Sequence, residues 1–158
     1  MFRISRRLDY GLQLMTALAN GPENQPQSTA SLSERLTIPL PFLHQIAHTL
    51  MQAGLIKATP GPRGGLRLNR GAEKISVREI AEALEGPIAL NPCVELTEED
   101  CSRLNQQNTQ IVWNQLQDSI IQMLDNVTLD MLTGSSETLP AYSLSMEQGV
   151  RQPRFSVN

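Results

Sequence analysis

The sequence predicts a mostly α-helical protein with one small β-hairpin. Apolar residues recur every three or four positions in several segments, which is the spacing of amphipathic helices. One segment, LIKATPGPRGGLRLN (residues 55–69), instead has two short apolar runs around a Pro/Gly turn, which is typical of a hairpin. A chain of 158 residues is long enough for one domain with an appendage.

Three helices are expected before the hairpin. The first should run from Arg6 to Ala19, with Ser5 as its cap. The second lies in STASLSERL (28–36), where Ser31 and Glu34 have the spacing of a capping box and Ser28 or Thr29 is the alternative cap of an earlier start.

The third helix is PFLHQIAHTLMQA (41–53), with Pro41 at its first position and Gly54 after its end. Its apolar residues predict one buried face. The polar edge that remains outside consists of His44, Gln45, His48, Thr49 and Gln52.

The second half of the chain should begin with a helix in SVREIAEALEG (76–86). Ser76 and Glu79 have the spacing of a capping box, and Gly86 ends the helix. Both cysteines of the chain follow in a loop of residues 87–107.

A long amphipathic helix should then run from about Asn108 to Leu124, followed by a short helix in TLDML (128–132). From residue 133 to residue 158 the chain is polar and weakly patterned, so we expect a largely disordered tail. Four apolar residues of the long helix repeat at near-heptad spacing: Trp113, Leu116, Ile120 and Met123.

Charge is distributed unevenly along the chain. Residues 1–78 contain ten Lys/Arg and four Asp/Glu, whereas residues 79–158 contain three Lys/Arg and twelve Asp/Glu. Although the net charge of the whole chain is −3, its N-terminal half is basic, which favours binding of that half to nucleic acid.

Three helices followed by a hairpin, in this order, make a winged helix-turn-helix, an arrangement that suits duplex DNA. The third helix can enter the major groove with its polar edge towards the bases. At the hairpin tip, glycines allow close backbone approach and Arg63 can contact phosphates or the minor groove. The predicted DNA contacts are Arg6, Arg7, Thr29, Pro41, His44, Gln45, His48, Arg63, Gly64 and Arg67.

The sequence contains no pattern that predicts an enzyme. It has no nucleophile–base arrangement, phosphate-binding loop or HExxH-type motif, and its two histidines lie on the predicted DNA helix. It also lacks an apolar run of about 20 residues, which a membrane span requires. The N-terminus has no continuous apolar segment of a secretory signal, so we expect a cytoplasmic protein with no membrane partner.

Four successive blocks of the chain resemble the Rrf-two family of regulators, of the IscR, NsrR and RirA type. The blocks are LDYGLQLMTALA, LSERLTIPLPFLHQIAHTLMQAGLI, GPRGGLRL and ISVREIAEALEGPIAL. The resemblance covers about residues 2–132. It implies a homodimeric winged-helix transcription factor that binds palindromic operators in double-stranded DNA and pairs through its long C-terminal helix.

This resemblance divides the chain into four parts. The stripe of Trp113, Leu116, Ile120 and Met123 would form the subunit interface, although an intramolecular core is the alternative. The parts are a DNA-binding domain (1–86), a cysteine sensor loop (87–107), a dimerisation helix region (108–132) and the tail (133–158).

The two cysteines, Cys93 and Cys101, can form a metal site, act as a redox pair or be inert. Many members of the resembled family hold an iron–sulfur cluster in this loop with three cysteines. Cys93 and Cys101 match the first two, but the third position falls near Gln107, where there is no cysteine. The chain therefore departs from the three-cysteine ligand set of that family.

The resemblance also places Asp9 where an aspartate of one subunit reaches the cluster of its partner. Two thiolates and Asp9 give three ligands, and a 2Fe–2S cluster is the form we favour. The fourth ligand is unknown, and the candidates are an exogenous molecule, Gln13 or an acid of the loop, namely Glu98, Glu99 or Asp100. Two alternatives remain: a cysteine redox switch or other metal, and a cluster-free regulator that responds to a small molecule or a protein partner.

Overall fold

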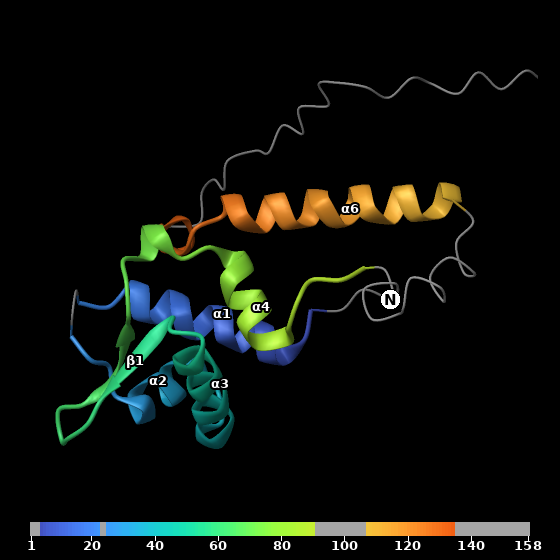
Figure 1. The fold of residues 1–158 in the computed structure, drawn as a ribbon. Coiled ribbons are helices and arrows are strands. Elements are labelled where there is room, and N and C mark those ends of the chain that lie inside the picture. Colours follow the sequence, from blue (N-terminus) through green and yellow to red (C-terminus); the bar gives the residue numbers. More distant parts are fainter. Residues whose placement is uncertain (1–3, 23–24, 91–106, 135–158) are drawn as a thin grey trace, which may run out of the picture.

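The computed structural model describes residues 4–22, 25–90 and 107–134 (Figure 1). The chain is mostly helical with one two-stranded antiparallel sheet, which confirms the predicted fold class. The elements, in order, are α1 (Arg6–Ala19), α2 (Thr29–Leu36), α3 (Leu40–Gln52), β1 (Ile56–Thr59), β2 (Gly65–Leu68), the 3-10 helix η1 (Ala72–Lys74), α4 (Val77–Glu85), α6 (Gln107–Asn126) and the 3-10 helix η3 (Leu129–Leu132).

Two of the predicted helix caps are present as expected. The Ser5 hydroxyl accepts a hydrogen bond from the Leu8 amide at 3.0 Å and starts α1. A full capping box starts α4, because Ser76 Oγ accepts from the Glu79 amide while the Glu79 carboxylate accepts from the Ser76 amide.

The start of α2 follows the earliest of the predicted alternatives, and the start of α3 differs from the prediction by one residue. Helix α2 begins at Thr29, with Ser28 as the cap residue and without a side-chain cap bond, so Ser31 lies inside the helix. Helix α3 begins at Leu40, which makes Pro41 its second residue rather than its first. Proline is tolerated there, because the amides of the first turn have no acceptor within the helix.

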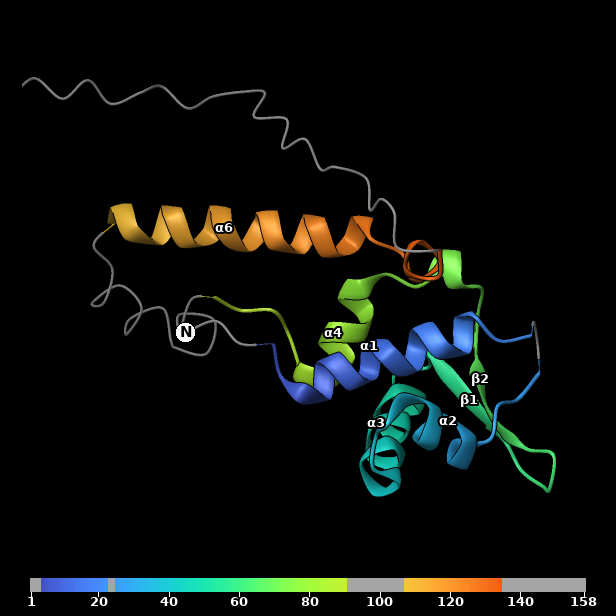
Figure 2. The ribbon, with the colours of Figure 1, turned by 180° about the vertical axis from the view of Figure 1, so that it is seen from behind.

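Helix α1 lies at the centre of the fold, between α3 and α4 (Figure 2). Its buried face packs into a single apolar core. A side chain at Gly11 would come within 2.2 Å of Leu84 Cδ1, so this glycine lets α1 and α4 approach closely. The core contains Leu14, Met15, Leu18, Leu32, Ile38, Leu43, Ile46, Leu50, Leu55, Ile56, Leu66, Ile75, Ile80, Leu84 and Leu129, among others.

The hairpin is joined to the helices through Gln27. Residue Leu66 of β2 exchanges two backbone hydrogen bonds with Gln27, at 2.8 and 2.9 Å. Next to it, Gly65 lies so close to this segment that a Cβ atom would sit 2.1 Å from the Gln27 carbonyl oxygen. The two strands pair in the register Ile56 with Leu68, Lys57 with Arg67, Ala58 with Leu66 and Thr59 with Gly65.

The C-terminal segment is tied to the start of α4. The Val77 amide donates to the Val127 carbonyl and the Leu129 amide donates to the Ile75 carbonyl, both at 2.8 Å. Arg78 forms ion pairs with Glu82 at 2.9 Å and with Asp125 of α6 at 2.8 Å. Hydrogen bonds from Arg78 to Glu82 and to Asp125 raise the pKa of its guanidinium.

From this anchor, α6 extends beyond the winged helix-turn-helix (Figures 1 and 2). Residues 91–106 of the predicted cysteine loop and the predicted tail from residue 135 lie outside the described residues, and Gln107, the last residue of the predicted loop, begins α6 instead. Within the described ranges, no helix combines the length and the apolar character needed to cross a bilayer.

Replacing Gly65 by Ala should destabilise the fold, because the new Cβ would clash with backbone rather than with a movable side chain. We expect a loss of about 2 kcal/mol or more in the free energy of unfolding, measured by urea denaturation. Gly134→Ala is the matched control, since a Cβ there meets no atom within 4 Å. Equal stability of the two variants would contradict the described junction between β2 and Gln27.

Candidate nucleic-acid interface and sensor site

Helix α3 presents a polar face to solvent. His44, Gln45 and His48 are exposed, and Pro41 and Gln52 are exposed on the same side. The opposite face is buried in the core by Leu43, Ile46, Ala47 and Leu50. The packing therefore fixes which side of α3 faces outward, and that side carries the predicted base-contacting residues.

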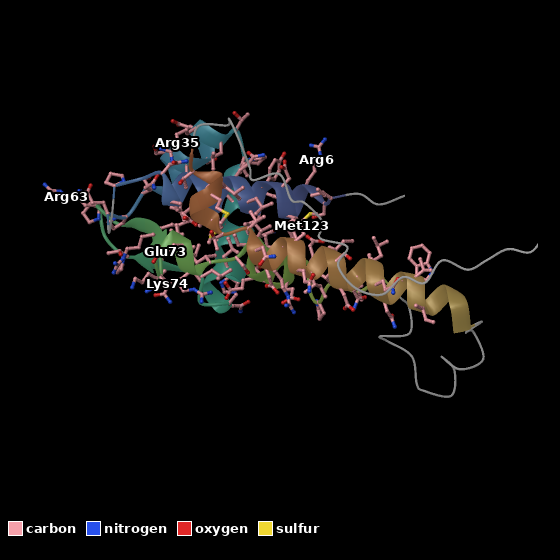
Figure 3. The ribbon with its side chains drawn as sticks, turned by 90° about the horizontal axis from the view of Figure 1, so that it is seen from above. Arg6, Arg35, Arg63, Glu73, Lys74 and Met123 are labelled. Atoms are coloured by element: carbon pink, nitrogen blue, oxygen red, sulfur yellow. The ribbon has the colours of Figure 1, made fainter. Side chains whose placement is uncertain are left out.

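The hairpin tip carries an exposed arginine next to a tight turn. Arg63 projects from the tip, away from the helices (Figure 3). The Gly64 amide donates to the Gly61 carbonyl at 2.9 Å, and a Cβ on Gly64 would lie 2.1 Å from the Thr59 carbonyl oxygen. The turn thus depends on a residue without a side chain.

A shallow hollow of about 350 Å³ joins the hairpin turn to the start of α2. Thr29 and Gly64 both line it, so two predicted contact residues from separate elements are brought together there. Arg67 lies elsewhere. It pairs in register with Lys57 and lines a second hollow, of about 380 Å³, beside the end of α1 together with Arg70.

The two arginines at the start of α1 differ in their surroundings. Both are exposed, and Arg6 points into solvent (Figure 3). The Arg7 guanidinium instead donates a hydrogen bond to Thr49 Oγ1 of α3, at 2.8 Å. This link was not predictable from sequence patterns, because it joins residues 42 positions apart.

Asp9 is exposed on the first turn of α1. One of its carboxylate oxygens accepts a hydrogen bond from Gln13 Nε2 at 2.9 Å, so the two side chains lie together. Both line an open hollow of about 610 Å³ between α1, α2 and η3, with Leu36 and Leu132 among the other lining residues. Cys93 and Cys101 lie outside the described residues, and the part of the chain that is described contains no group of three His, Cys, Asp or Glu side chains that could hold a metal ion.

A further pair of polar residues supports the hairpin and was not predicted. Gln27 Nε2 donates to the Ala17 carbonyl at 3.1 Å, and its Oε1 accepts from Arg35 Nη2 at 2.7 Å. Gln27 therefore connects α1, α2 and β2 through its side chain and backbone. Sequence patterns do not reveal such a residue, because its partners lie in three different elements.

Apolar residues of α6 are exposed in the single chain. Val112, Leu116 and Met123 are 60%, 40% and 44% exposed, and helical spacing places them on one face. Trp113 is also exposed, whereas Ile120 is half-buried. On the side of α6 that faces the body, Gln117 Oε1 accepts a hydrogen bond from the Leu90 amide at 3.0 Å.

Comparisons with known proteins agree with this geometry. The family model of Rrf2, described as an iron-dependent transcriptional regulator, matches residues 4–135. The HTH-type transcriptional regulator IscR of Pectobacterium atrosepticum is 30% identical over 137 residues, which cover 87% of this chain and 82% of that protein.

Two solved structures are similar over most of the chain. CymR, the global cysteine regulator of B. subtilis, superposes with a TM-score of 0.72 at 29% identity, covering 84% of this chain and 97% of that one. IscR of T. potens has a TM-score of 0.67 at 33% identity, covering 83% and 86%. These relatives are regulators and not enzymes, as the sequence predicted, and the chain belongs to the Rrf2 (Rrf-two) family of DNA-binding transcriptional regulators.

Proposed function

We propose that this regulator acts as a homodimer that binds a palindromic operator, and that an iron–sulfur cluster or the redox state of its cysteines modulates this binding. The observation that carries the DNA half of the proposal is the exposed polar face of α3, together with the exposed Arg63 at the hairpin tip. Major-groove recognition requires a helix whose outer face carries donors and acceptors, and α3 has them in His44, Gln45 and His48.

The amide of Gln45 can donate and accept at once, which suits the edge of adenine in the major groove. Arg63 supplies positive charge to phosphates or to the minor groove, and Arg6 does the same at the start of α1. Thr29 and Gly64 line the hollow between α2 and the hairpin, where they can approach the sugar–phosphate backbone of the DNA. Pro41 and Arg67 complete the proposed contact set.

The exposed apolar face of α6 supports self-association. Exposed residues such as Val112, Leu116 and Met123 would be covered if the α6 helices of two copies packed together. A two-fold dimer would also present two copies of α3, which matches a palindromic operator. Trp113 and Ile120 of the predicted stripe belong to the same proposed interface.

For the cofactor, the donor set consists of two thiols and a carboxylate. Asp9 is exposed and uses one oxygen to bind Gln13, which leaves the other available to a metal ion held by a second copy. Cys93 and Cys101 would supply thiolates, the preferred ligands of iron–sulfur clusters. A bound 2Fe–2S cluster would supply one-electron redox chemistry, and the fourth ligand would come from outside this set.

The start of α1 offers a route from the sensor segment to the DNA-binding face. Glu85 ends α4 just before the cysteine-containing segment, and its carboxylate accepts a hydrogen bond from Ser5 Oγ at 2.7 Å. Asp9 lies on the turn that Ser5 caps. A change in the cysteine segment would therefore act on the first turn of α1 from two sides.

A cluster-free regulator is the second candidate. The absence of a third cysteine favours it, and so does the similarity to CymR, a global cysteine regulator. In this version the cysteines form a thiol switch or are incidental, and the signal is a small molecule or a protein partner.

The base-reading role of α3 can be tested on an operator selected from a random duplex library. Gln45→Ala should weaken operator binding by roughly tenfold, because a lost base contact costs about 1–3 kcal/mol, while binding to unrelated DNA stays the same. Arg63→Ala should lower the slope of log affinity against log salt concentration by about 1. Asp118→Asn, on the exposed surface of α6, serves as the control. If both variants bind the operator with the affinity and the salt dependence of the control, α3 and the hairpin are not the DNA interface.

Self-association can be measured on the full chain by sedimentation equilibrium. Leu116→Glu should weaken the dimer by roughly 30-fold or more, because it places a charge in the proposed apolar contact. Gln122→Glu adds the same charge on the other side of α6 and should leave the dimer intact. A wild-type chain that sediments as a monomer would remove the dimer from the proposal.

The cofactor can be tested by isolating the full chain without oxygen and analysing iron, sulfide and the absorption spectrum. We expect a coloured protein that contains both elements, and loss of colour in Cys93→Ser, Cys101→Ser and Asp9→Ala. Wild-type protein without iron or sulfide would favour the cluster-free candidate. Unchanged regulation in cells carrying both Ser substitutions would further exclude a thiol switch.

A further inference from the structure

The first turn of α1 holds the recognition helix through a short chain of hydrogen bonds. Arg7 Nη2 donates to Thr49 Oγ1 at 2.8 Å, and Thr49 Oγ1 donates to the Gln45 carbonyl at 3.1 Å. A hydroxyl has one hydrogen to donate and lone pairs that accept, and a guanidinium can only donate. The guanidinium of Arg7 therefore donates, the hydroxyl of Thr49 both accepts and donates, and the carbonyl of Gln45 accepts.

A second contact acts on the same flank of α3. The rings of Tyr10 and Phe42 meet edge to face, with centroids 5.9 Å apart and planes at 87°. Tyr10 lies one turn after Arg7 on α1, and Phe42 lies two turns before Thr49 on α3, so the contacts are separated along both helices. Two separated contacts on one flank restrict rotation of α3 about its own axis.

This restriction matters because the flank borders the reading face. Gln45 both provides the carbonyl that ends the hydrogen-bond chain and presents its side chain to solvent. A small rotation of α3 would move His44, Gln45 and His48 together relative to the bases. Direct readout requires donors and acceptors within a few tenths of an ångström of their partners, so orientation of the helix limits affinity.

We propose that Arg7 is a positioning residue that sets the orientation of α3 through Thr49, rather than a contact to the DNA backbone. The inference rests on the proposed function, since it assumes that α3 reads the operator. The two roles predict different effects on operator affinity. If Arg7 contacted a phosphate, operator affinity would depend on the charge of Arg7 and not on Thr49. If Arg7 positions α3, operator affinity depends equally on Arg7 and on Thr49.

The experiment compares Arg7→Met, Thr49→Val and the double variant with wild-type full-length chain on the selected operator. Met keeps the length of the arginine side chain without its donors, and Val keeps the shape of threonine without its hydroxyl. Each single variant should lower operator affinity by roughly three- to tenfold, which is the range for the net contribution of one ordinary hydrogen bond. The double variant should lose no more operator affinity than either single variant, because both substitutions break the same chain of hydrogen bonds.

The salt dependence separates positioning from charge. The slope of log affinity against log salt should stay at the wild-type value in Arg7→Met, whereas Arg6→Met, which removes the neighbouring exposed arginine, should lower it by about 0.9 if Arg6 contacts a phosphate. Thermal unfolding of every variant checks that the fold is retained. If Arg7→Met does not fold, Thr49→Val still tests the inference, because it leaves Arg7 intact.

Two results would overturn the inference: wild-type affinity in Thr49→Val, or a lowered salt slope in Arg7→Met with additive losses in the double variant. Failure of the proposed function gives a different result, because Gln45→Ala would then bind the operator like wild type. If Gln45→Ala weakens binding while Thr49→Val does not, only the positioning role is wrong.

Discussion

The structure depends on the packing of α1 between α3 and α4. Leu14 and Met15 are fully buried on this helix, and Gly11 has no side chain where α1 meets Leu84 of α4. Close approach at that point brings the first turn of α1 within reach of both neighbours. The hydrogen bond from Ser5 to Glu85 on one side and the hydrogen bond from Arg7 to Thr49 on the other both follow from this packing.

This arrangement gives the first turn of α1 a central place in a regulator. It carries Asp9, the proposed ligand for the cluster of a second copy, and it contacts the end of α4 just before the cysteine segment. It also contacts the flank of α3, whose outer face carries the proposed base contacts. A signal that shifts this turn by a fraction of an ångström would change the orientation of α3. This requires that the signal, such as a bound cluster, binds more tightly to one orientation of the turn than to the other.

Much of the fold was predictable, because its signals are local. The spacing of apolar residues predicted α1, and the Pro/Gly turn between two short apolar runs predicted the hairpin. The spacing of Ser76 and Glu79 predicted the capping box of α4. Residues that act between elements were not predictable: Gln27 joins three elements, and Arg7 bonds a residue 42 positions away. The exposed side of α3 was predictable from its apolar pattern, but the separation of Arg67 from the hairpin tip required the strand register.

In the proposed complex, two copies of α3 read one operator together. The most direct measurement is a hydroxyl-radical footprint of the full chain on a selected operator. We expect two symmetric half-sites whose centres lie one helical turn, about 10 base pairs, or a multiple of it apart. A single unpaired protected segment, or uniform protection along any duplex, would contradict it.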